Sequence, residues 1–456
     1  MLTLPTDFHT EVLTPDDAGY DEARSVFNAM IDRRPLVIVR CRNADDVVRG
    51  LALARERDLV VSVRGGGHNV AGNAVCDGGV MLDLSPMRAV RVDPEGRTAI
   101  ADPGCLLGDL DRATQAHGLA TPTGVMSGTG LAGLTLGGGL GWLNGRCGLA
   151  CDNLVAADVV TAGGDVRHVS AEQHPDLLWG LRGGGGNFGI VTAFTYALHP
   201  VGTVLAGGLV HPWSAARDVL RFHDEFVAAA PDELATAVSL FRDPQQGPLV
   251  SIGLCWSGDP ADGERALAPL RAFGRALADT VDVLPFADWQ RAPDASYPRG
   301  RLHYWKSGYL RDLTDDAIAA LLSLVPDMPS ATSGIGLQGF RGAASRVPVD
   351  ATAFPHRVPQ YDFLILGQWD DPAESERNIA WSRAAFATVR PHLADAVYVN
   401  NLGAEGPDRV RAAYGPNHTR LAALKAAYDP DNVFRLNQNV PPSDAVHRRT
   451  HPQPKG

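Results

Sequence analysis

The apolar and polar positions of the first 200 residues form short apolar runs separated by amphipathic stretches. Residues 35–41 (PLVIVRC) and 59–65 (LVVSVRG) have the apolar, β-branched composition of buried strands. Between them, residues 43–58 carry apolar positions at helical spacing, and Asn43 is a good N-cap. A strand, a helix and a strand in this order predict a βαβ unit with a parallel sheet.

The same reasoning predicts more elements before residue 200. They are helices at 21–32 and 105–118, short strands within 78–84 and 89–104, a hairpin at 153–170 around Gly163 and Gly164, and a strand at 189–200. The segment RGGGHN (64–69) begins at the carboxyl end of the second strand of the βαβ unit. Open α/β sheets bind ligands at that edge.

The pattern changes after about residue 200. Residues 214–231 and 259–277 have the spacing of amphipathic helices, and apolar strands occur at 236–242, 248–258 and 333–342. Strands interleaved with helices that cover one face predict an α+β domain with an antiparallel sheet. We expect the second face of this sheet to cover a binding site.

Composition and charge narrow the function. The chain has 456 residues, of which 45% are hydrophobic and 20% charged, as in a globular protein of two or three domains. A net charge of −11 argues against a nucleic-acid partner, because phosphates require a basic surface. The N-terminus lacks the features of a signal peptide, and no apolar run approaches the ~20 residues that span a bilayer. We therefore expect a cytoplasmic protein without a membrane partner.

The six cysteines are scattered along the chain. Cys147 and Cys151 have C-x3-C spacing, but no second pair or histidine cluster completes a metal site. We expect free thiols and no bound metal.

Glycine is the most unusual residue of the composition. The 49 glycines cluster at 64–68, 124–142 and 181–189, where the backbone can approach a ligand closely. Two G-x-G-x-x-G matches, Gly128–Gly133 and Gly184–Gly189, lack the strand–turn–helix order that a dinucleotide-binding Rossmann fold requires. The sequence also has no P-loop motif. His68, directly behind three glycines, is either a solvated turn residue or a ligand contact.

Four ordered segments carry a resemblance to a known family: 63–87, 124–154, 177–196 and 428–442. Together they resemble the berberine bridge enzyme-like flavoproteins of the vanillyl-alcohol oxidase superfamily, and look most similar to its bacterial members. The resemblance implies a two-domain α+β fold. Residues 1–200 and 395–456 would form the FAD-binding domain. Residues 201–394 would form the substrate-binding domain, with helices covering an antiparallel sheet.

The resemblance also implies how FAD is held. In the family, the histidine of RGGGHN is bonded covalently to the flavin, and the preceding glycines offer backbone N–H groups to the pyrophosphate. His68 would form this link. The other implied FAD contacts are Arg64, Gly65, Gly66, Gly67, Asn69, Gly128, Thr129, Gly133, Gly137, Gly138, Gly141, Asn153, Gly189, Ile190, Val191, Asn437 and Asn439. Some relatives add a second link from a cysteine, but that position falls on Met126, so a single covalent link is expected.

The catalytic segment departs from the family pattern. Many relatives carry a tyrosine base in a Y-x-N-Y segment, whereas this chain has YVNN (398–401) with Asn401, which has no useful basicity, in that position. The strand-like segment 301–310 offers other side chains, which alternate between two faces. The catalytic candidates are Tyr304, His303 and Asn401, and the substrate-binding candidates are Trp305, Lys306 and Gln338.

These features predict an FAD-dependent oxidoreductase. Its substrate would be a small organic molecule, of aromatic, heterocyclic or secondary-metabolite type, oxidised by hydride transfer to covalently bound flavin with O2 as electron acceptor. One alternative is a flavin-dependent monooxygenase or rearrangement catalyst acting on a polyketide-type substrate. Another is a flavin-carrying binding protein without turnover.

Overall fold

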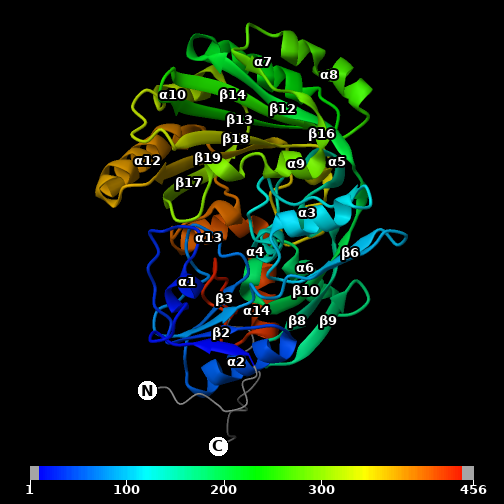
Figure 1. The fold of residues 1–456 in the computed structure, drawn as a ribbon, viewed down its shortest axis with the longest axis vertical. Coiled ribbons are helices and arrows are strands. Elements are labelled where there is room, and N and C mark those ends of the chain that lie inside the picture. Colours follow the sequence, from blue (N-terminus) through cyan, green and yellow to red (C-terminus); the bar gives the residue numbers. More distant parts are fainter. Residues whose placement is uncertain (1–9, 444–456) are drawn as a thin grey trace, which may run out of the picture.

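The structure, a computed structural model, describes residues 10–443 and contains three main sheets (Figure 1). Two of them, formed mainly by the first 200 residues, lie together at one end of the molecule. The third and largest sheet lies at the other end of the molecule. It faces the two smaller sheets across the middle of the molecule (Figure 1). The structure is therefore an α+β fold.

The first sheet contains the predicted βαβ unit. Its strands, in the order β1-β2-β4-β3, are β1 (Glu11–Leu13), β2 (Val37–Arg40), β4 (Val80–Asp83) and β3 (Val61–Arg64). The pairs β2–β4 and β3–β4 are parallel. Helix α2 (Ala44–Glu56) connects β2 to β3, and the Asn43 side chain accepts a hydrogen bond from the Asp46 N–H. RGGGHN accordingly starts at the carboxyl end of a parallel strand, as predicted.

The helix predicted at 21–32 is wrong in length. Helix α1 spans only Tyr20–Arg24. Beyond it, the backbone N–H of Phe27 donates to the carbonyl of Gly67, and the Asn28 side chain donates to the carbonyls of Val70 and His303. These contacts with distant segments replace the helical hydrogen bonds that the local spacing favoured.

The second sheet is antiparallel and has the order β5-β6-β10-β8-β9. Its strands are β5 (Val90–Asp93), β6 (Thr98–Ala101), β10 (Ile190–Ala197), β8 (Leu154–Val160) and β9 (Val166–Ser170). The predicted hairpin at 153–170 is the pair β8–β9. The predicted helix at 105–118 is α3 (Leu107–Gln115), and two further helices pack here, α4 (Leu131–Leu136) and α6 (Pro175–Leu181).

The large sheet is also antiparallel and has the order β15-β12-β14-β13-β18-β19-β17, with β16 paired to β12. Its strands are β12 (Thr203–Pro212), β13 (Leu234–Asp243), β14 (Gly247–Trp256), β15 (Ala278–Asp279), β16 (Asp282–Pro285), β17 (Leu302–Leu310), β18 (Gly334–Phe340) and β19 (Gln360–Trp369).

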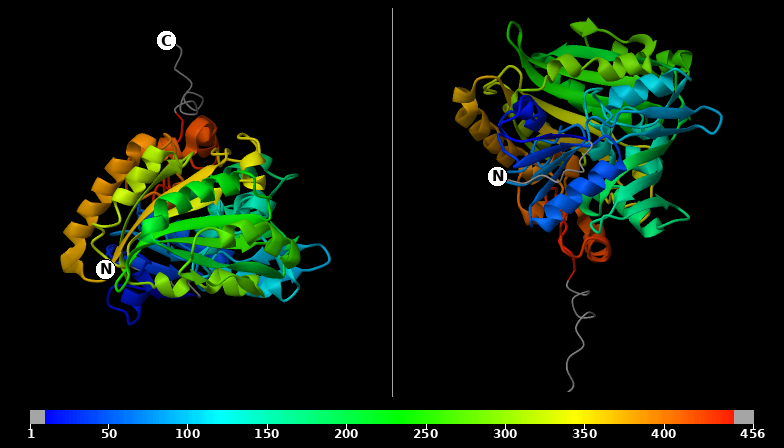
Figure 2. Two further views of the ribbon diagram at one scale, coloured as in Figure 1. Left: turned by 90° about the horizontal axis from the view of Figure 1, so that it is seen from above. Right: turned by 60° about the horizontal axis from the view of Figure 1, so that its bottom comes forward.

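Helices cover the outer face of the large sheet (Figures 1 and 2). They are α7 (Ala216–Ala228), α8 (Pro260–Ala272), α10 (Asp315–Ser323) and α12 (Ser375–Val389). Apolar side chains of this face, such as Val238, Leu337 and Phe363, form a core with the helices. Burying them removes apolar surface from water, at roughly 25 cal/mol per Å². The opposite face of the sheet is left for the cavity.

The other helices of residues 10–443 lie outside this layer. They are α5 (Asn144–Cys147), α9 (Phe286–Arg291), α11 (Ala343–Arg346), α13 (Pro407–Tyr414) and α14 (His418–Tyr428), with the short strand pair β7 (Leu119–Ala120) and β11 (His199–Pro200). Among residues 10–443, no helix combines the length and the apolar character needed to cross a membrane.

Candidate active site

A cavity of about 750 Å³ lies between the large sheet and the two smaller ones. This volume is within the range of ~300–1,000 Å³ that small-molecule and cofactor sites occupy. Its walls come from the glycine-rich segments after β3 and around α4, from the start of β10, from the inner face of the large sheet, and from the C-terminal segment. None of the described lining residues is Lys, Arg or Glu, and the lining carboxylate is Asp362.

His68 lies in this wall in an apolar setting. Its ring stacks on Phe27 with centroids 4.0 Å apart, and the other side of Phe27 stacks on His303 at 4.4 Å. Burial, with smaller contributions from Arg299 and His303, lowers the pKa of His68 to about 4. The imidazole is therefore neutral at physiological pH. Its Nε2 is buried and has no hydrogen-bond partner among the described residues.

Two glycines allow the backbone segments beside His68 to cross in contact. A Cβ on Gly130 would lie 2.6 Å from the Cα of Gly66, closer than real Cβ contacts. A Cβ on Gly65 would lie 2.9 Å from the carbonyl oxygen of Pro103. Side chains are excluded here by the packing itself, which leaves backbone N–H groups as the polar lining. Such a cradle suits a phosphate without any lysine.

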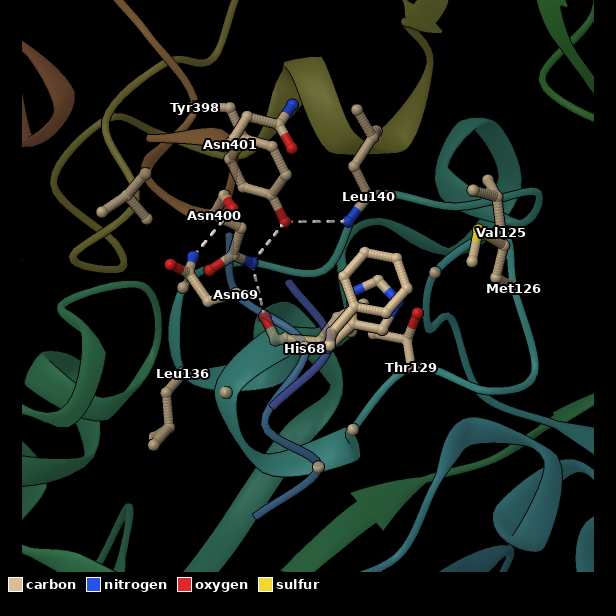
Figure 3. Close-up of a pocket in the computed structure, with 18 of the residues that line it drawn as sticks. His68, Asn69, Val125, Met126, Thr129, Leu136, Leu140, Tyr398, Asn400 and Asn401 are labelled. Atoms are coloured by element: carbon tan, nitrogen blue, oxygen red, sulfur yellow. Dashed lines mark hydrogen bonds between the residues drawn. The ribbon is translucent and has the colours of Figure 1, made fainter. Parts of the chain in front are cut away.

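A hydrogen-bond network links the C-terminal segment to the glycine loops (Figure 3). The Tyr398 hydroxyl accepts from the N–H groups of Gly139 at 2.7 Å and Leu140 at 3.3 Å, and from the side-chain amide of Asn400 at 2.8 Å. The Asn69 amide donates to the carbonyl of Asn400 at 3.0 Å. Tyr398 is thereby fixed as an acceptor in this network, and burial raises its pKa well above the usual value.

Asp362 of β19 and Asn401 form a polar pair next to this network, with Asn401 beside Tyr398 (Figure 3). The Asn401 Nδ2 donates to the Asp362 Oδ2 at 2.7 Å, while the Asp362 Oδ1 has no partner among the described residues. Burial raises the pKa of this carboxyl to about 8, against the opposing effect of the Asn401 hydrogen bond. A carboxyl that titrates near neutral pH, inside a cavity, can accept or donate a proton during a reaction.

Most of the FAD contacts implied by the sequence do line the cavity. They are His68, Gly65, Gly66, Gly67, Asn69, Thr129, Gly133, Gly137, Gly189, Ile190, Val191 and Asn437. Met126 lines the cavity as well, whereas Cys147 and Cys151 do not. All six cysteines are free, as expected.

The remaining implied FAD contacts lie outside the lining. The Asn153 amide donates to the carbonyls of Cys147 and Leu149, so it supports a turn. Arg64 donates to the carbonyls of Ala23 and Ser25, and forms an ion pair with Asp83 at 3.4 Å. The other residues in this group are Gly128, Gly138, Gly141 and Asn439. These residues do not line the cavity, so their contact with the cofactor stays a prediction.

The catalytic and substrate candidates on β17 divide between the two faces of the sheet, as alternation predicted. Trp305 lines the cavity. Tyr304 lies on the helix-covered face, where its hydroxyl accepts from the Arg383 Nε at 3.1 Å. The Lys306 Nζ lies on the same side, 3.3 Å from the Glu405 carboxylate. Catalysis by Tyr304 and substrate binding by Lys306 are therefore wrong, because both side chains point into the layer beneath α12.

Two further candidates are refined by their surroundings. His303 is buried against Phe27 behind the cavity wall, and burial lowers its pKa to about 4. It is a neutral packing residue rather than a base in contact with the cavity. Gln338 of β18 lines the cavity directly opposite Asp362 in the strand register.

Sequence reasoning missed the carboxylate itself. Asp362 stands inside YDFLILGQW, an otherwise apolar strand. A charged residue in such a run is a signal, because an unpaired buried carboxylate is costly and is retained where chemistry needs it. Phe27, Trp142 and Trp289, which also line the cavity, were not predicted either.

Comparisons with known proteins agree with this geometry. A family model described as "FAD binding domain" matches residues 35–170, and another described as "Berberine and berberine like" matches residues 397–441. The chain is 31% identical to (R)-6-hydroxynicotine oxidase of Paenarthrobacter nicotinovorans, over 97% of this chain and 98% of that protein. The chain belongs to the berberine bridge enzyme-like family of FAD-linked oxidoreductases. It is also 31% identical to YgaK, an uncharacterized FAD-linked oxidoreductase of Bacillus subtilis, over 94% of this chain and 96% of that one.

Solved structures show the same fold. The structure of 6-hydroxy-D-nicotine oxidase from Arthrobacter nicotinovorans matches with a TM-score of 0.90 at 30% identity, covering 97% of this chain and 100% of that one. The moss enzyme Physcomitrella patens BBE-like 1 matches with a TM-score of 0.86 at 22% identity, covering 95% and 97%, which shows the fold alone. The chain is thus an FAD-dependent enzyme of the oxidoreductase class that acts on a small substrate.

Proposed function

We propose that the enzyme oxidises a C–H bond next to a hydroxyl or amine group of its substrate, with Asp362 as the base and O2 as the electron acceptor. The observation that carries this proposal is the buried Asp362–Asn401 pair, because it is the titratable acid of the described cavity lining and has a free oxygen. Its pKa of about 8 is near the value at which a general base is most effective.

The chemistry divides between cofactor and chain. The FAD held by the glycine segments would supply a hydride acceptor for the substrate carbon and a route for the two electrons to O2, which would be reduced to hydrogen peroxide. Asp362 takes the proton from the substrate O–H or N–H, so that the C–O or C–N bond becomes double. Asn401 holds the carboxylate oxygen that does not face the substrate. This assigns to Asn401 a positioning role in place of the tyrosine base of relatives.

We also propose the single covalent link through His68. The support is that the imidazole is neutral, buried and unpartnered at Nε2, since a ring nitrogen must have its lone pair free to form a bond to carbon. The division of the chain follows the same proposal, with FAD held by residues 1–200 and 395–456 and the substrate bound mainly by residues 201–394.

Denaturation and peroxide measurements test this function. FAD is expected to remain with the chain after acid precipitation, and His68→Ala is expected to release it. Release of all flavin from the denatured wild-type protein would overturn the covalent link. Hydrogen peroxide formed in a one-to-one ratio with product supports the oxidase reaction, while oxygen incorporated into the product would favour the monooxygenase alternative.

The proposed base bears on the remaining alternative, a flavin-carrying binding protein. That alternative rested on the amide at position 401, which cannot remove a proton. Asp362 supplies the missing group within hydrogen-bond distance of that amide.

A further inference from the structure

Three glycines on the cavity face of the large sheet have no structural reason to be glycine. Gly208, Gly253 and Gly336 line the cavity from β12, β14 and β18, and none of them has a positive φ. A Cβ would meet its nearest neighbour at 3.8 Å on Gly208, 3.5 Å on Gly253 and 3.6 Å on Gly336, which are ordinary contacts. Glycine in a strand interior weakens the strand, so its presence needs another explanation.

A neighbouring glycine shows what a structural requirement looks like. Gly207, next to Gly208 on β12, has a φ of 158°, and a Cβ there would lie 2.6 Å from the Thr280 carbonyl carbon. Packing against β15 and β16 excludes a side chain at this position. At the three cavity glycines, by contrast, a Cβ would clash with nothing, and a side chain would only fill part of the cavity.

The strand register arranges two of these glycines, Gly208 and Gly253, in a row that ends at the proposed base. Gly336 lies in the next row, opposite Ser239. Gly208 pairs with Gly253, Gly253 with Ala237, Ala237 with Gln338, and Gln338 with Asp362. Neighbouring strands lie ~4.8 Å apart, so the row spans roughly 19 Å from β12 to β19. Its first three members carry no side chain larger than a methyl group. They form a shallow floor that a flat molecule can lie against.

Trp142 and Trp289 lie beside this floor, and Trp305 lines the cavity from β17, on the other side of β18 and β19. Trp142 is 8% exposed, lines the cavity next to Gly253, and its Nε1 has no hydrogen-bond partner among the described residues. Trp289 and Trp305 also line the cavity, and their Nε1 atoms also lack a hydrogen-bond partner among the described residues. The Trp142 and Trp289 rings lie 5.1 Å apart. A buried indole N–H normally has an acceptor, since leaving it unpaired costs about 1–3 kcal/mol. The cavity lining therefore contains indole rings whose N–H groups are buried and have no acceptor among the described residues.

The charge of the lining restricts the ligand further. The glycine segments beside His68 offer a backbone cradle to the FAD phosphates, but the backbone N–H groups of the sheet are paired between strands. Because no Lys or Arg side chain is among the described lining residues, a carboxylate or phosphate substituent that lies against the sheet would be buried without a counter-ion. Serine hydroxyls at 239 and 251 on the second row of the floor are small and neutral. Uncharged oxygen substituents satisfy the indole donors without this cost.

We propose that the substrate is a planar, uncharged aromatic molecule of at least two rings that carries oxygen acceptors. Its rings lie across β12, β14 and β13 on the glycine floor, its acceptors meet the indole N–H groups, and its reacting group lies at Asp362. The position of the reacting group rests on the proposed function, in which Asp362 is the base. The planar, aromatic and oxygen-bearing character of the substrate is inferred independently, from the glycine floor and the indole groups.

Binding of simple probes to the holoenzyme tests this substrate class without turnover. The probes are 2-naphthol, the carboxylate 2-naphthoate, the saturated analogue decahydro-2-naphthol, the acceptor-free naphthalene, and D-glucose. Binding is followed by tryptophan fluorescence and by the absorbance of the bound flavin. We expect 2-naphthol to bind at least tenfold more tightly than each of the other four.

Matched variants locate the binding site on the floor. Gly253→Ala and Gly208→Val fill it and are expected to weaken 2-naphthol binding about fivefold and about tenfold, with an unchanged or higher melting temperature. The control is Gly334→Val on β18, because Gly334 lies outside the lining and a Cβ there is 3.6 Å from its nearest neighbour. It should leave binding unchanged. Trp142→Phe should weaken 2-naphthol but not naphthalene.

Three outcomes would overturn the proposal: equal binding of 2-naphthol and 2-naphthoate, tighter binding of glucose or decahydro-2-naphthol, or wild-type affinity for 2-naphthol in both floor variants. Failure of the proposed function would look different. A noncovalent flavin, or full activity in a variant without the Asp362 carboxylate, would leave the probe affinities as expected.

Discussion

At the scale of single residues, the Asp362 carboxylate determines the expected pH dependence. A base must be ionised to act, and burial raises the pKa of Asp362 to about 8. The rate of flavin reduction by substrate under anaerobic conditions should therefore rise with pH through about 8 and level off above it. Asp362→Asn keeps the shape of the side chain but removes the base, and should slow this step by ~10²–10⁴-fold. An unchanged rate in this variant would exclude Asp362 as the base.

Asn401 should act on the same titration. Its amide donates to the carboxylate and thereby opposes the effect of burial on the Asp362 pKa. Asn401→Ala removes this hydrogen bond, so the acid limb of the rate profile should move to higher pH. The rate should recover at pH values well above the limb, which a purely structural defect would not allow. The measurement is the reduction rate across pH in both proteins.

Tyr304 provides the contrasting prediction on β17. Its hydroxyl accepts from Arg383 on the helix-covered face, away from the cavity. Tyr304→Phe should leave the rate and pH profile of flavin reduction at the wild-type values. Trp305→Phe, one residue along and facing the cavity, removes an unpartnered indole donor and should raise the KM. If Tyr304→Phe lost activity while Trp305→Phe did not, the assignment of the two faces would be reversed.

These residues show how much of the site the sequence can predict. His68 and the glycines around it are recognisable because a short motif carries them, and the structure brings them to the cavity. The position of Asn401 is recognisable for the same reason. Asp362 is not, because its partner Asn401 is 39 residues away in sequence. The two meet because residues 399–401 pack beside β17, where the Ser307 hydroxyl donates to the Asn401 carbonyl, and β17 pairs with β19.

At the scale of elements, the crossing of two glycine segments beside His68 is the most sensitive point. Gly130→Ala would force a Cβ to 2.6 Å from Gly66, so the loop after β3 and the start of α4 must separate. We expect loss of bound FAD and a lower melting temperature. Gly133→Ala is the matched control for stability within α4, because nothing lies within 4 Å of a Cβ there except the cavity that Gly133 lines. Alanine also favours the helix, so this variant should be at least as stable as the wild type.

The elements that the sequence predicts best are those with local signals. Helix α2 begins after Asn43, whose side chain accepts from the N–H of Asp46, and its apolar stripe packs on the first sheet. Residues 25–32 have a similar spacing but are not helical, because Asn28 and Phe27 bind distant backbone groups. Such long-range hydrogen bonds are not visible in a local pattern.

At the scale of the whole molecule, α3 of the second sheet packs against α9, which follows β16 of the large sheet. The Gln290 side chain of α9 donates to Asp111 of α3 at 3.4 Å and to the Thr123 hydroxyl at 3.0 Å. The backbone carbonyl of Gln290 accepts from the Ser127 N–H at 3.1 Å. The Asp111 carboxyl is thus buried where the part of the molecule with the smaller sheets meets the part with the large sheet.

Asp111 should make stability depend on pH. Burial raises its pKa from 3.8 to about 7, although Gln290 opposes this effect. The unfolded chain loses this proton near pH 4 and the folded chain only near pH 7, so the stabilising contribution of the protonated carboxyl is complete below about pH 4. It is lost as the pH rises through 7. The difference in pKa corresponds to roughly 4 kcal/mol.

Asp111→Asn keeps the hydrogen-bonding shape and cannot ionise, so the variant should avoid this loss. Its melting temperature relative to the wild type should increase steadily between pH 4 and 7 and stay constant above pH 7, as measured by thermal unfolding in matched buffers. Asp218→Asn, on the exposed side of α7, serves as the control and should give a much smaller change over the same interval. A constant difference between Asp111→Asn and the wild type from pH 4 to 8 would mean that Asp111 is ionised in the folded protein, and that the contact between α3 and α9 admits water.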